Sequence, residues 1–180
     1  MTVDVHAHII VPEITSAADP GDAWRPVVRQ DGGAQAVEFG GRTLRSVVGE
    51  FVHVERILEE AAARGVNRLV LSPWVNLLPY DLGVDEAVRA CRVQNDALAA
   101  LCAAYPDRVA AFGAVPLQDP GVAVRELERA LAEPGVAGVE VAASVAARSV
   151  PGAPVPAPRA GMFPAASTRG TSPACRKRSS

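Results

Sequence analysis

The stretch VERILEEAAARGVNRLVLS, residues 54–72, decides the fold of this chain. Val54, Leu58 and Ala61 recur at helical spacing, and Gly65 follows where a glycine commonly ends a helix. Residues 66–72 (VNRLVLS) then form a short apolar strand that Pro73 stops. A helix followed directly by a buried strand is part of a β-α-β unit. The stretch therefore predicts a parallel sheet covered by helices.

The same alternation continues on both sides of this stretch. Residues 2–8 (TVDVHAH) alternate with period two and predict a first strand, and the apolar segments 109–115 and 136–142 predict two more. Between them, the sequence predicts a helix from Asp85 to about residue 105 and another from Asp119 to about residue 133. We expect their buried side chains to be Val88, Cys91, Leu98, Leu101 and Cys102 on the first helix, and Val124, Leu127 and Leu131 on the second.

The segment between the first strand and the first helix carries the signals of an insertion. Residues 12–33 are rich in proline and glycine and predict a long loop. Residues 36–39 and 43–48 flank Gly40-Gly41 and predict a two-stranded hairpin with a tight glycine turn.

Charge divides the chain into two unlike parts. The net charge of −2 is an average, because residues 1–143 hold all 20 acids against 12 basic residues, whereas residues 144–180 hold no acid and six basic residues. The second part also lacks leucine and has six of the 15 prolines. We expect a folded domain over 1–143 and a disordered tail over 144–180.

Several classes of protein are not favoured by these counts. No apolar run is long enough to span a membrane, so we expect no membrane partner. Three cysteines without a C-x-x-C pair suit neither a disulfide framework nor a thiolate metal site, and the cytoplasm is the expected compartment. The basic run 176–178 lies in proline-rich sequence, so we expect no nucleic-acid binding from it.

His6 and His8 are the clearest candidates for chemistry. In a strand, residues i and i+2 point to the same face, so both imidazoles can converge on one divalent ion such as Zn²⁺. They also lie at the carboxyl end of the first strand of a β-α series, where barrel enzymes place their active sites. The alternative is one core histidine and one solvated histidine.

Further ligands are harder to find. His53 is better interpreted as a solvated residue at a helix start. Asp4 lies two residues before His6 and either orients an imidazole or belongs to the barrel floor, and Glu140 is either a ligand or structural. Residues 144–180 contain no histidine or acid, so this chain supplies half of a metal site, and we assign no catalytic residue.

Substrate-contacting candidates come from the hairpin and from the loop after residue 72. Arg45 is either one exposed cation among many or a clamp for a substrate carboxylate, which a guanidinium binds bidentately. Trp74, together with Asn76 and Tyr80, either contacts substrate or packs the loop.

The segments VDVHAHIIVPE, VERILEEAAARGVNRLVLS, RVQNDALAALCAAYPDRVAAFGAVPLQDP and GVAGVEVAA together resemble the amidohydrolase-related family, in particular the branch typified by aminocarboxymuconate-semialdehyde decarboxylase. The resemblance covers about residues 1–143. It implies an α/β fold, the first half (strands 1–4) of a (β/α)8 TIM barrel with a β-hairpin inserted after strand 1. It further implies Zn²⁺ or another divalent metal bound by His6 and His8, and a substrate-carboxylate contact at Arg45.

The implied activity is decarboxylation (a carboxy-lyase) or hydrolysis of a small carboxylic acid. The family's further ligands, after strands 5, 6 and 8, have no counterpart here, so we expect a truncated chain that is inactive by itself. Its open sheet edge favours either aggregation or formation of a homodimer. The alternative is a non-enzymatic fragment that acts as an interaction or weak metal-binding module. A reading-frame shift near residues 143–147 is our hypothesis for the change in composition, and translating the genomic DNA in the other frames tests it.

Overall fold

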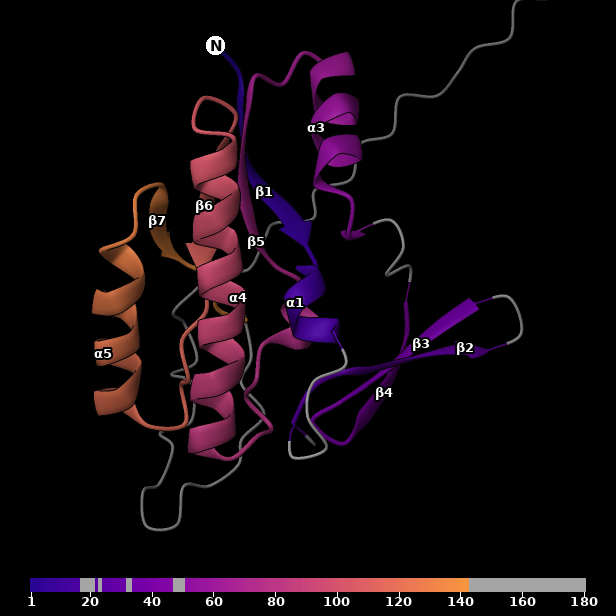
Figure 1. Cartoon of the computed structure of the whole chain (residues 1–180), viewed down its shortest axis with the longest axis vertical. Coiled ribbons are helices and arrows are strands. Elements are labelled where there is room, and N and C mark those ends of the chain that lie inside the picture. Colours follow the sequence, from indigo (N-terminus) through magenta and orange to yellow (C-terminus); the bar gives the residue numbers. More distant parts are fainter. Residues whose placement is uncertain (17–21, 23, 32–33, 47–50, 143–180) are drawn as a thin grey trace, which may run out of the picture. The chain divides into compact units, whose positions relative to one another are not determined.

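The computed structural model describes residues 1–16, 22, 24–31, 34–46 and 51–142 (Figure 1). Its main feature is a parallel sheet in the order β1-β5-β6-β7, made of β1 (Val3–Ile9), β5 (Arg68–Pro73), β6 (Val109–Gly113) and β7 (Val136–Val139). The order follows the sequence, and a helix precedes or separates the last three strands. The predicted parallel α/β sheet is confirmed.

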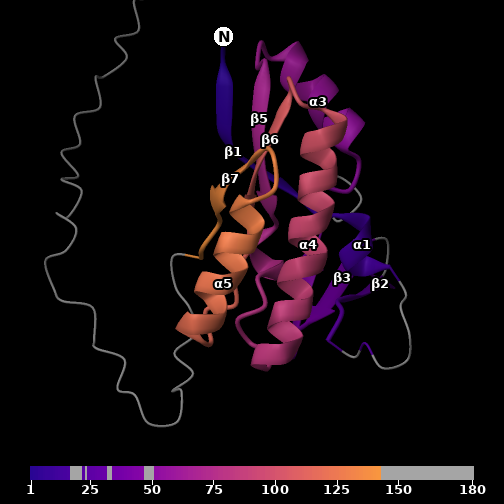
Figure 2. The same ribbon diagram turned by 60° about the vertical axis from the view of Figure 1, so that its left-hand side comes forward.

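Three helices accompany these strands: α3 (Val54–Ala63), α4 (Val84–Ala104) and α5 (Pro120–Leu131). In Figure 2, α4 and α5 lie side by side against one face of the sheet. The cap of α5 is as predicted, because Asp119 Oδ1 accepts a hydrogen bond from Val122 N at 2.9 Å. The cap of α4 is Gly83 instead of Asp85, and Gly83 N donates to Glu86 Oε2 at 3.3 Å.

The core lies between the sheet and its helices. Along β6, Val109, Ala111 and Gly113 are buried while the intervening Ala110 and Phe112 are half-buried, as period-two alternation requires. The intervening residues of β6 are thus less buried than the residues that alternate with them.

The inserted segment is a three-stranded antiparallel sheet, not a two-stranded hairpin. It consists of β2 (Val27–Asp31), β3 (Ala34–Phe39) and β4 (Arg42–Ser46), and the short helix α1 (Pro12–Thr15) precedes it. The predicted long loop over 12–33 is therefore wrong. Strand β2 (VVRQD) has only two apolar residues, which stand next to each other, so it shows no alternation. Pairing with β3 holds it instead, including an ion pair between Arg29 Nε and Glu38 Oε1 at 2.9 Å.

The buried face of α5 also differs from the prediction. Val124 is 52% exposed and Leu131 is 46% exposed, so neither points inward as expected. The helix instead buries Ala123, Glu126 and Ala130, since Glu126 is drawn toward polar partners on α4. On α4, Cys91, Leu98 and Cys102 are buried as predicted, and Val88 and Leu101 are half-buried.

Some predictions fall on residues that the structure does not describe. The end of the predicted hairpin (47–48), the domain boundary at 143 and the disordered tail over 144–180 lie outside the described residues and stay predictions. Within the described part, no helix is long and apolar enough to cross a membrane.

Candidate metal and substrate site

Strand β1 brings the imidazoles of His6 and His8 together. Their ring centroids are 4.7 Å apart, and the ring planes meet at 77°. Two imidazoles that share a tetrahedral ion, with nitrogen–metal distances of about 2.0–2.1 Å, have centroids about 5 Å apart. His6 is exposed and His8 is half-buried. The centroid spacing of this pair is therefore compatible with a shared divalent ion.

His8 is anchored on the neighbouring strand β5. Its Nδ1 lies 3.1 Å from the carbonyl oxygen of Pro73 and 3.1 Å from Ser72 Oγ. The register explains both contacts, because His8 pairs with Ser72 and Ile9 with Pro73. The ring of His8 is thus held from one side, through one nitrogen.

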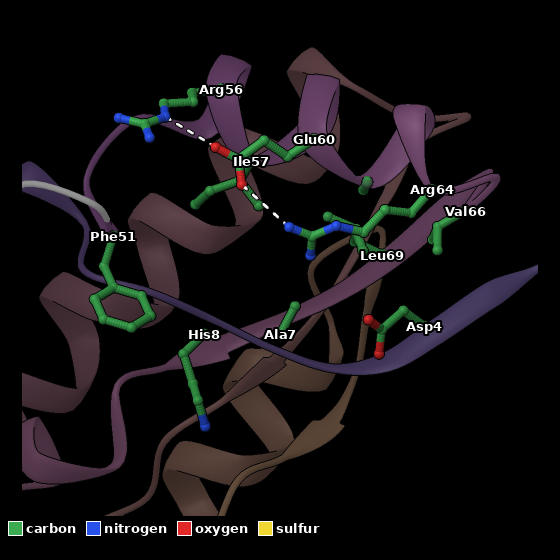
Figure 3. Close-up of a pocket in the computed structure, with 11 residues that line it drawn as sticks. Asp4, Ala7, His8, Phe51, Arg56, Ile57, Glu60, Arg64, Val66 and Leu69 are labelled. Atoms are coloured by element: carbon green, nitrogen blue, oxygen red, sulfur yellow. Dashed lines mark hydrogen bonds and ion pairs between the residues drawn. The ribbon is translucent and has the colours of Figure 1, made fainter. Parts of the chain in front are cut away.

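Asp4 does not share the face of the histidines. The β1–β5 register shifts between Asp4 and Ala7, so the period-two alternation is broken there. Figure 3 shows Asp4 and Ala7 on the α3 side of β1, whereas the ring of His8 lies on the other side. Asp4 Oδ1 accepts a hydrogen bond from the backbone N of His6 at 3.0 Å. Its carboxylate therefore positions the bulged backbone and does not contact the imidazoles.

The cavity that Asp4 enters lies between β1 and α3 and has a volume of about 320 Å³ (Figure 3). The charged side chains that α3 and its C-terminal cap contribute to the cavity form ion pairs with one another. Glu60 Oε1 lies 2.9 Å from Arg56 Nε, and Glu60 Oε2 lies 3.7 Å from Arg64 Nη2. His8 is also among the residues that line this cavity, although its ring points to the other side of β1 (Figure 3).

The other proposed ligands stay apart from this pair. His53 is exposed at the N-terminal cap of α3. Glu140 follows β7 instead of lying inside it, and its backbone N donates to the Gly113 carbonyl at 2.8 Å. Across the part of the chain that the structure describes, no three His, Cys, Asp or Glu side chains gather closely enough to bind a metal ion.

Arg45 lies exposed on β4, opposite Ala36 of β3. The sheet that carries it is attached to the loop after β5 through Arg42, whose Nε lies 2.9 Å from Asp81 Oδ2. Arg42 Nη2 also donates to the Asn76 carbonyl at 3.3 Å. Asn76 thus contributes a backbone oxygen to this attachment.

Trp74 and Tyr80 occupy packing positions in the same loop. Trp74 is half-buried and stacks on Phe51, with ring centroids 6.2 Å apart and planes at 17°. Tyr80 is buried against Cys91 and Ala114. Burial raises the pKa of Tyr80, and the backbone of Ala142 partly opposes that shift. Contact of Trp74 with substrate stays a prediction.

A buried polar cluster between α4 and α5 was not predicted from the sequence. Asn95, on the buried face of α4, is 2% exposed and donates from Nδ2 to Glu126 Oε1 at 2.8 Å. Glu126 is 3% exposed and also accepts from Arg129 Nη2 at 2.7 Å and Arg92 Nε at 3.3 Å. Burial by itself would raise the pKa of Glu126, but the hydrogen bonds from Arg129, Asn95 and Arg92 hold that pKa below its ordinary value.

The buried cysteines do not offer a nucleophile. Cys91 and Cys102 are free thiols on α4, and both are buried. Burial raises the pKa of both, so neither is a thiolate at neutral pH.

With this geometry established, comparison with known proteins defines the class. The model of the amidohydrolase family matches residues 3–165, which is most of the chain. The chain therefore belongs to the amidohydrolase family, and the match extends past residue 143, where the resemblance in sequence was expected to end.

Among curated relatives, the chain is similar to a gamma-resorcylate decarboxylase of Rhizobium radiobacter, with 42% identity over 72 residues. That alignment covers 38% of this chain and 21% of the relative. Among solved structures, it is similar to the 2,6-dihydroxybenzoate decarboxylase from Rhizobium, with 26% identity and a TM-score of 0.55 over 77% of this chain and 37% of the other.

A third similar protein is the 5-carboxyvanillate decarboxylase of Novosphingobium aromaticivorans, complexed with manganese and 4-hydroxy-3-methoxy-5-nitrobenzoic acid. It shares 28% identity at a TM-score of 0.52, over 55% of this chain and 28% of the other. The chain thus spans about a fifth of the length of the curated relative and about a third of the solved structures. These matches confirm the predicted fold as the first part of the barrel of such decarboxylases.

Proposed function

We propose that this chain carries the first metal ligands, His6 and His8, of a metal-dependent carboxy-lyase that acts on a small aromatic carboxylic acid. The observation that carries the proposal is the pair of imidazole rings 4.7 Å apart on β1. It is supported by the similar proteins, which are a gamma-resorcylate decarboxylase, a 2,6-dihydroxybenzoate decarboxylase and a 5-carboxyvanillate decarboxylase.

The residues fit a divalent ion in the chemistry of their donors. Neutral imidazole nitrogens are good ligands for Zn²⁺ and are compatible with Mn²⁺, which a similar protein contains. When bound, such an ion supplies Lewis-acid polarisation of a substrate oxygen. His6 and His8 would bind it, and we favour Zn²⁺ or Mn²⁺.

The substrate contacts belong to the inserted sheet and the loop after β5. An exposed guanidinium such as that of Arg45 can bind a benzoate carboxylate through two parallel hydrogen bonds. Trp74 offers an aromatic surface, although its stacking on Phe51 fixes its orientation. In this proposal Arg45 holds the carboxylate and Trp74 contacts the ring.

The second candidate function is a non-enzymatic, weakly metal-binding module. The observation that favours it is that only two imidazoles converge, with no third ligand beside them among the residues described. The chain has three histidines in total, and the third, His53, stands apart at the cap of α3. We therefore propose that the 180-residue chain binds metal weakly and does not turn over substrate by itself.

Two aspects of the setting complete the proposal. Strands β1 and β7 are the outer strands of the described sheet, so a homodimer could form through these edges. Free, buried thiols at Cys91 and Cys102 suit a reducing cytoplasm.

Metal titration combined with a decarboxylation assay tests the proposal. Calorimetry with Mn²⁺ and Zn²⁺ is expected to show binding to the wild-type chain and to His53→Ala, and none to the double variant His6→Ala/His8→Ala. The release of CO₂ from 2,6-dihydroxybenzoate is expected to be absent. Equal binding by the double variant would refute the ligand assignment, and turnover by the wild type would refute the two-ligand account of this chain.

A further inference from the structure

The two partners of His8 Nδ1 differ in what they can do. The carbonyl oxygen of Pro73, at 3.1 Å, can only accept a hydrogen bond. The hydroxyl of Ser72, also at 3.1 Å, can donate or accept. A bare Nδ1 would place its lone pair against the Pro73 oxygen, and the two would repel. The contact is favourable only when Nδ1 carries the hydrogen.

We propose that Ser72 and the Pro73 carbonyl are positioning groups that hold neutral His8 as its Nδ1–H tautomer, which leaves the lone pair on Nε2 for the metal. This inference rests on the proposed metal-binding function. A hydrogen bond to the non-ligating ring nitrogen fixes both the tautomer and the ring orientation of a histidine ligand.

The surroundings of these two groups keep them in place. Ser72 is 1% exposed, so water does not compete for its hydroxyl. The chain after Pro73 is held to β1, because the backbone N of Trp74 donates to the Ile9 carbonyl at 3.1 Å. The ring of Trp74 is fixed in turn by its stacking on Phe51. These contacts hold the Pro73 carbonyl beside His8.

His6 provides an internal comparison. It is exposed, and within the described part of the chain no group hydrogen-bonds to either of its ring nitrogens. Its backbone N donates to Asp4 Oδ1. We therefore expect His6 to exchange between both tautomers in the metal-free chain, while His8 keeps one.

The tautomers are read directly from long-range ¹H–¹⁵N correlation spectra of the ¹⁵N-labelled, metal-free 180-residue chain. The spectra are recorded near pH 8. The His6→Ala and His53→Ala variants assign the His8 signals. The expected pattern has a protonated Nδ1 and a bare Nε2 for His8, and averaged signals for His6. A His8 ring protonated mainly on Nε2 overturns the inference.

Substitution of Ser72 tests its own contribution. Ser72→Ala is expected to shift the His8 signals toward a mixture of tautomers and to weaken Mn²⁺ binding roughly tenfold or more, as loss of an outer-shell hydrogen bond does. Thr43→Ala, which removes an exposed hydroxyl on β4, is the matched control and is expected to change neither. If Ser72→Ala leaves both the tautomer and the Mn²⁺ affinity unchanged, Ser72 is not a positioning residue.

The two proposals fail in different ways. A wild-type chain that shows His8 as the Nδ1–H tautomer but binds neither Mn²⁺ nor Zn²⁺ contradicts the metal function and supports the tautomer assignment. A chain that binds Mn²⁺ through His6 and His8 yet shows His8 as the Nε2–H tautomer without metal supports the function and contradicts the tautomer assignment.

Discussion

The side-chain amide of Asn95 binds the backbone of Ala114 through both of its polar atoms. Ala114 N donates to Asn95 Oδ1 at 2.7 Å, and Asn95 Nδ2 donates to the Ala114 carbonyl at 2.9 Å. The same Nδ2 reaches Glu126, so one amide connects α4, the residue after β6 and α5. Ala114 follows the carboxyl end of β6, the edge of the sheet at which barrel enzymes act.

Replacing Asn95 by alanine is expected to destabilise the chain strongly. The change leaves a buried N–H, a buried carbonyl and part of a buried carboxylate without partners, each of which costs about 1–3 kcal/mol. We expect the free energy of unfolding in urea to fall by roughly 3 kcal/mol or more. Glu128→Gln, an exposed change on α5, is the control and is expected to stay within about 0.5 kcal/mol of the wild type. A loss below about 1 kcal/mol in Asn95→Ala would contradict the buried cluster.

Glu126 is expected to make stability depend on pH in the acid range. Its pKa in the folded chain lies below the ordinary value of 4.5. A carboxyl group with a lowered pKa stabilises the fold fully above its unfolded pKa, and this contribution is lost as pH falls through the folded pKa. Urea unfolding from pH 7 down to pH 3 should show this loss in the wild type and a weaker pH dependence in Glu126→Gln. If the free energy of unfolding depends on pH in the same way in both proteins, Glu126 is not the source of the acid-range loss of stability.

Gly65 and Gly135 offer a matched pair of substitutions. Both have positive φ, +79° and +89°. A Cβ on Gly65 would meet open space, whereas a Cβ on Gly135 would lie 2.6 Å from the Cβ of Cys102. Gly65→Ala is therefore expected to cost about 1–2 kcal/mol from backbone strain, and Gly135→Ala about 1–3 kcal/mol more from overpacking. Equal losses in chemical denaturation would show that the approach to Cys102 is not a constraint.

Arg45 is expected to matter for ligand binding and not for folding. If it clamps the carboxylate, Arg45→Ala should weaken binding of 2,6-dihydroxybenzoate to the Mn²⁺-loaded chain by roughly ten- to a hundredfold, the effect of losing hydrogen bonds to a charged group. Arg29→Ala, on strand β2 at the other edge of the same sheet, removes another exposed guanidinium and is the control. Equal affinities in the two variants would leave Arg45 as one surface cation among many.

The main parallel sheet could be predicted from the sequence, because each strand and helix in it has a recognisable local pattern. Val66–Ser72 and Val109–Val115 are short apolar runs between helical patterns, and the H-x-H spacing places two imidazoles on one face of a strand. The structure has the predicted parallel order and the two rings close together.

Other features depend on contacts between distant residues and were missed for that reason. Strand β2 is stabilised by pairing with β3 and has no apolar period of its own. The face of α5 that is buried is the one that carries Glu126. Glu126 accepts a hydrogen bond from Asn95, which lies 31 positions earlier in the sequence. One signal was available, because Asn95 lies on the stripe of α4 that also carries Cys91 and Leu98. A polar residue on such a stripe predicts a buried partner.

The account depends most on the claim that His6 and His8 bind one ion together. Electron spin echo envelope modulation of the Mn²⁺-loaded chain counts the imidazole nitrogens coordinated to the metal. The account predicts two histidine nitrogens in the wild type, one in His6→Ala or His8→Ala, and two in His53→Ala. Absence of coordinated imidazole in the wild type, or no change in either single variant, would contradict it.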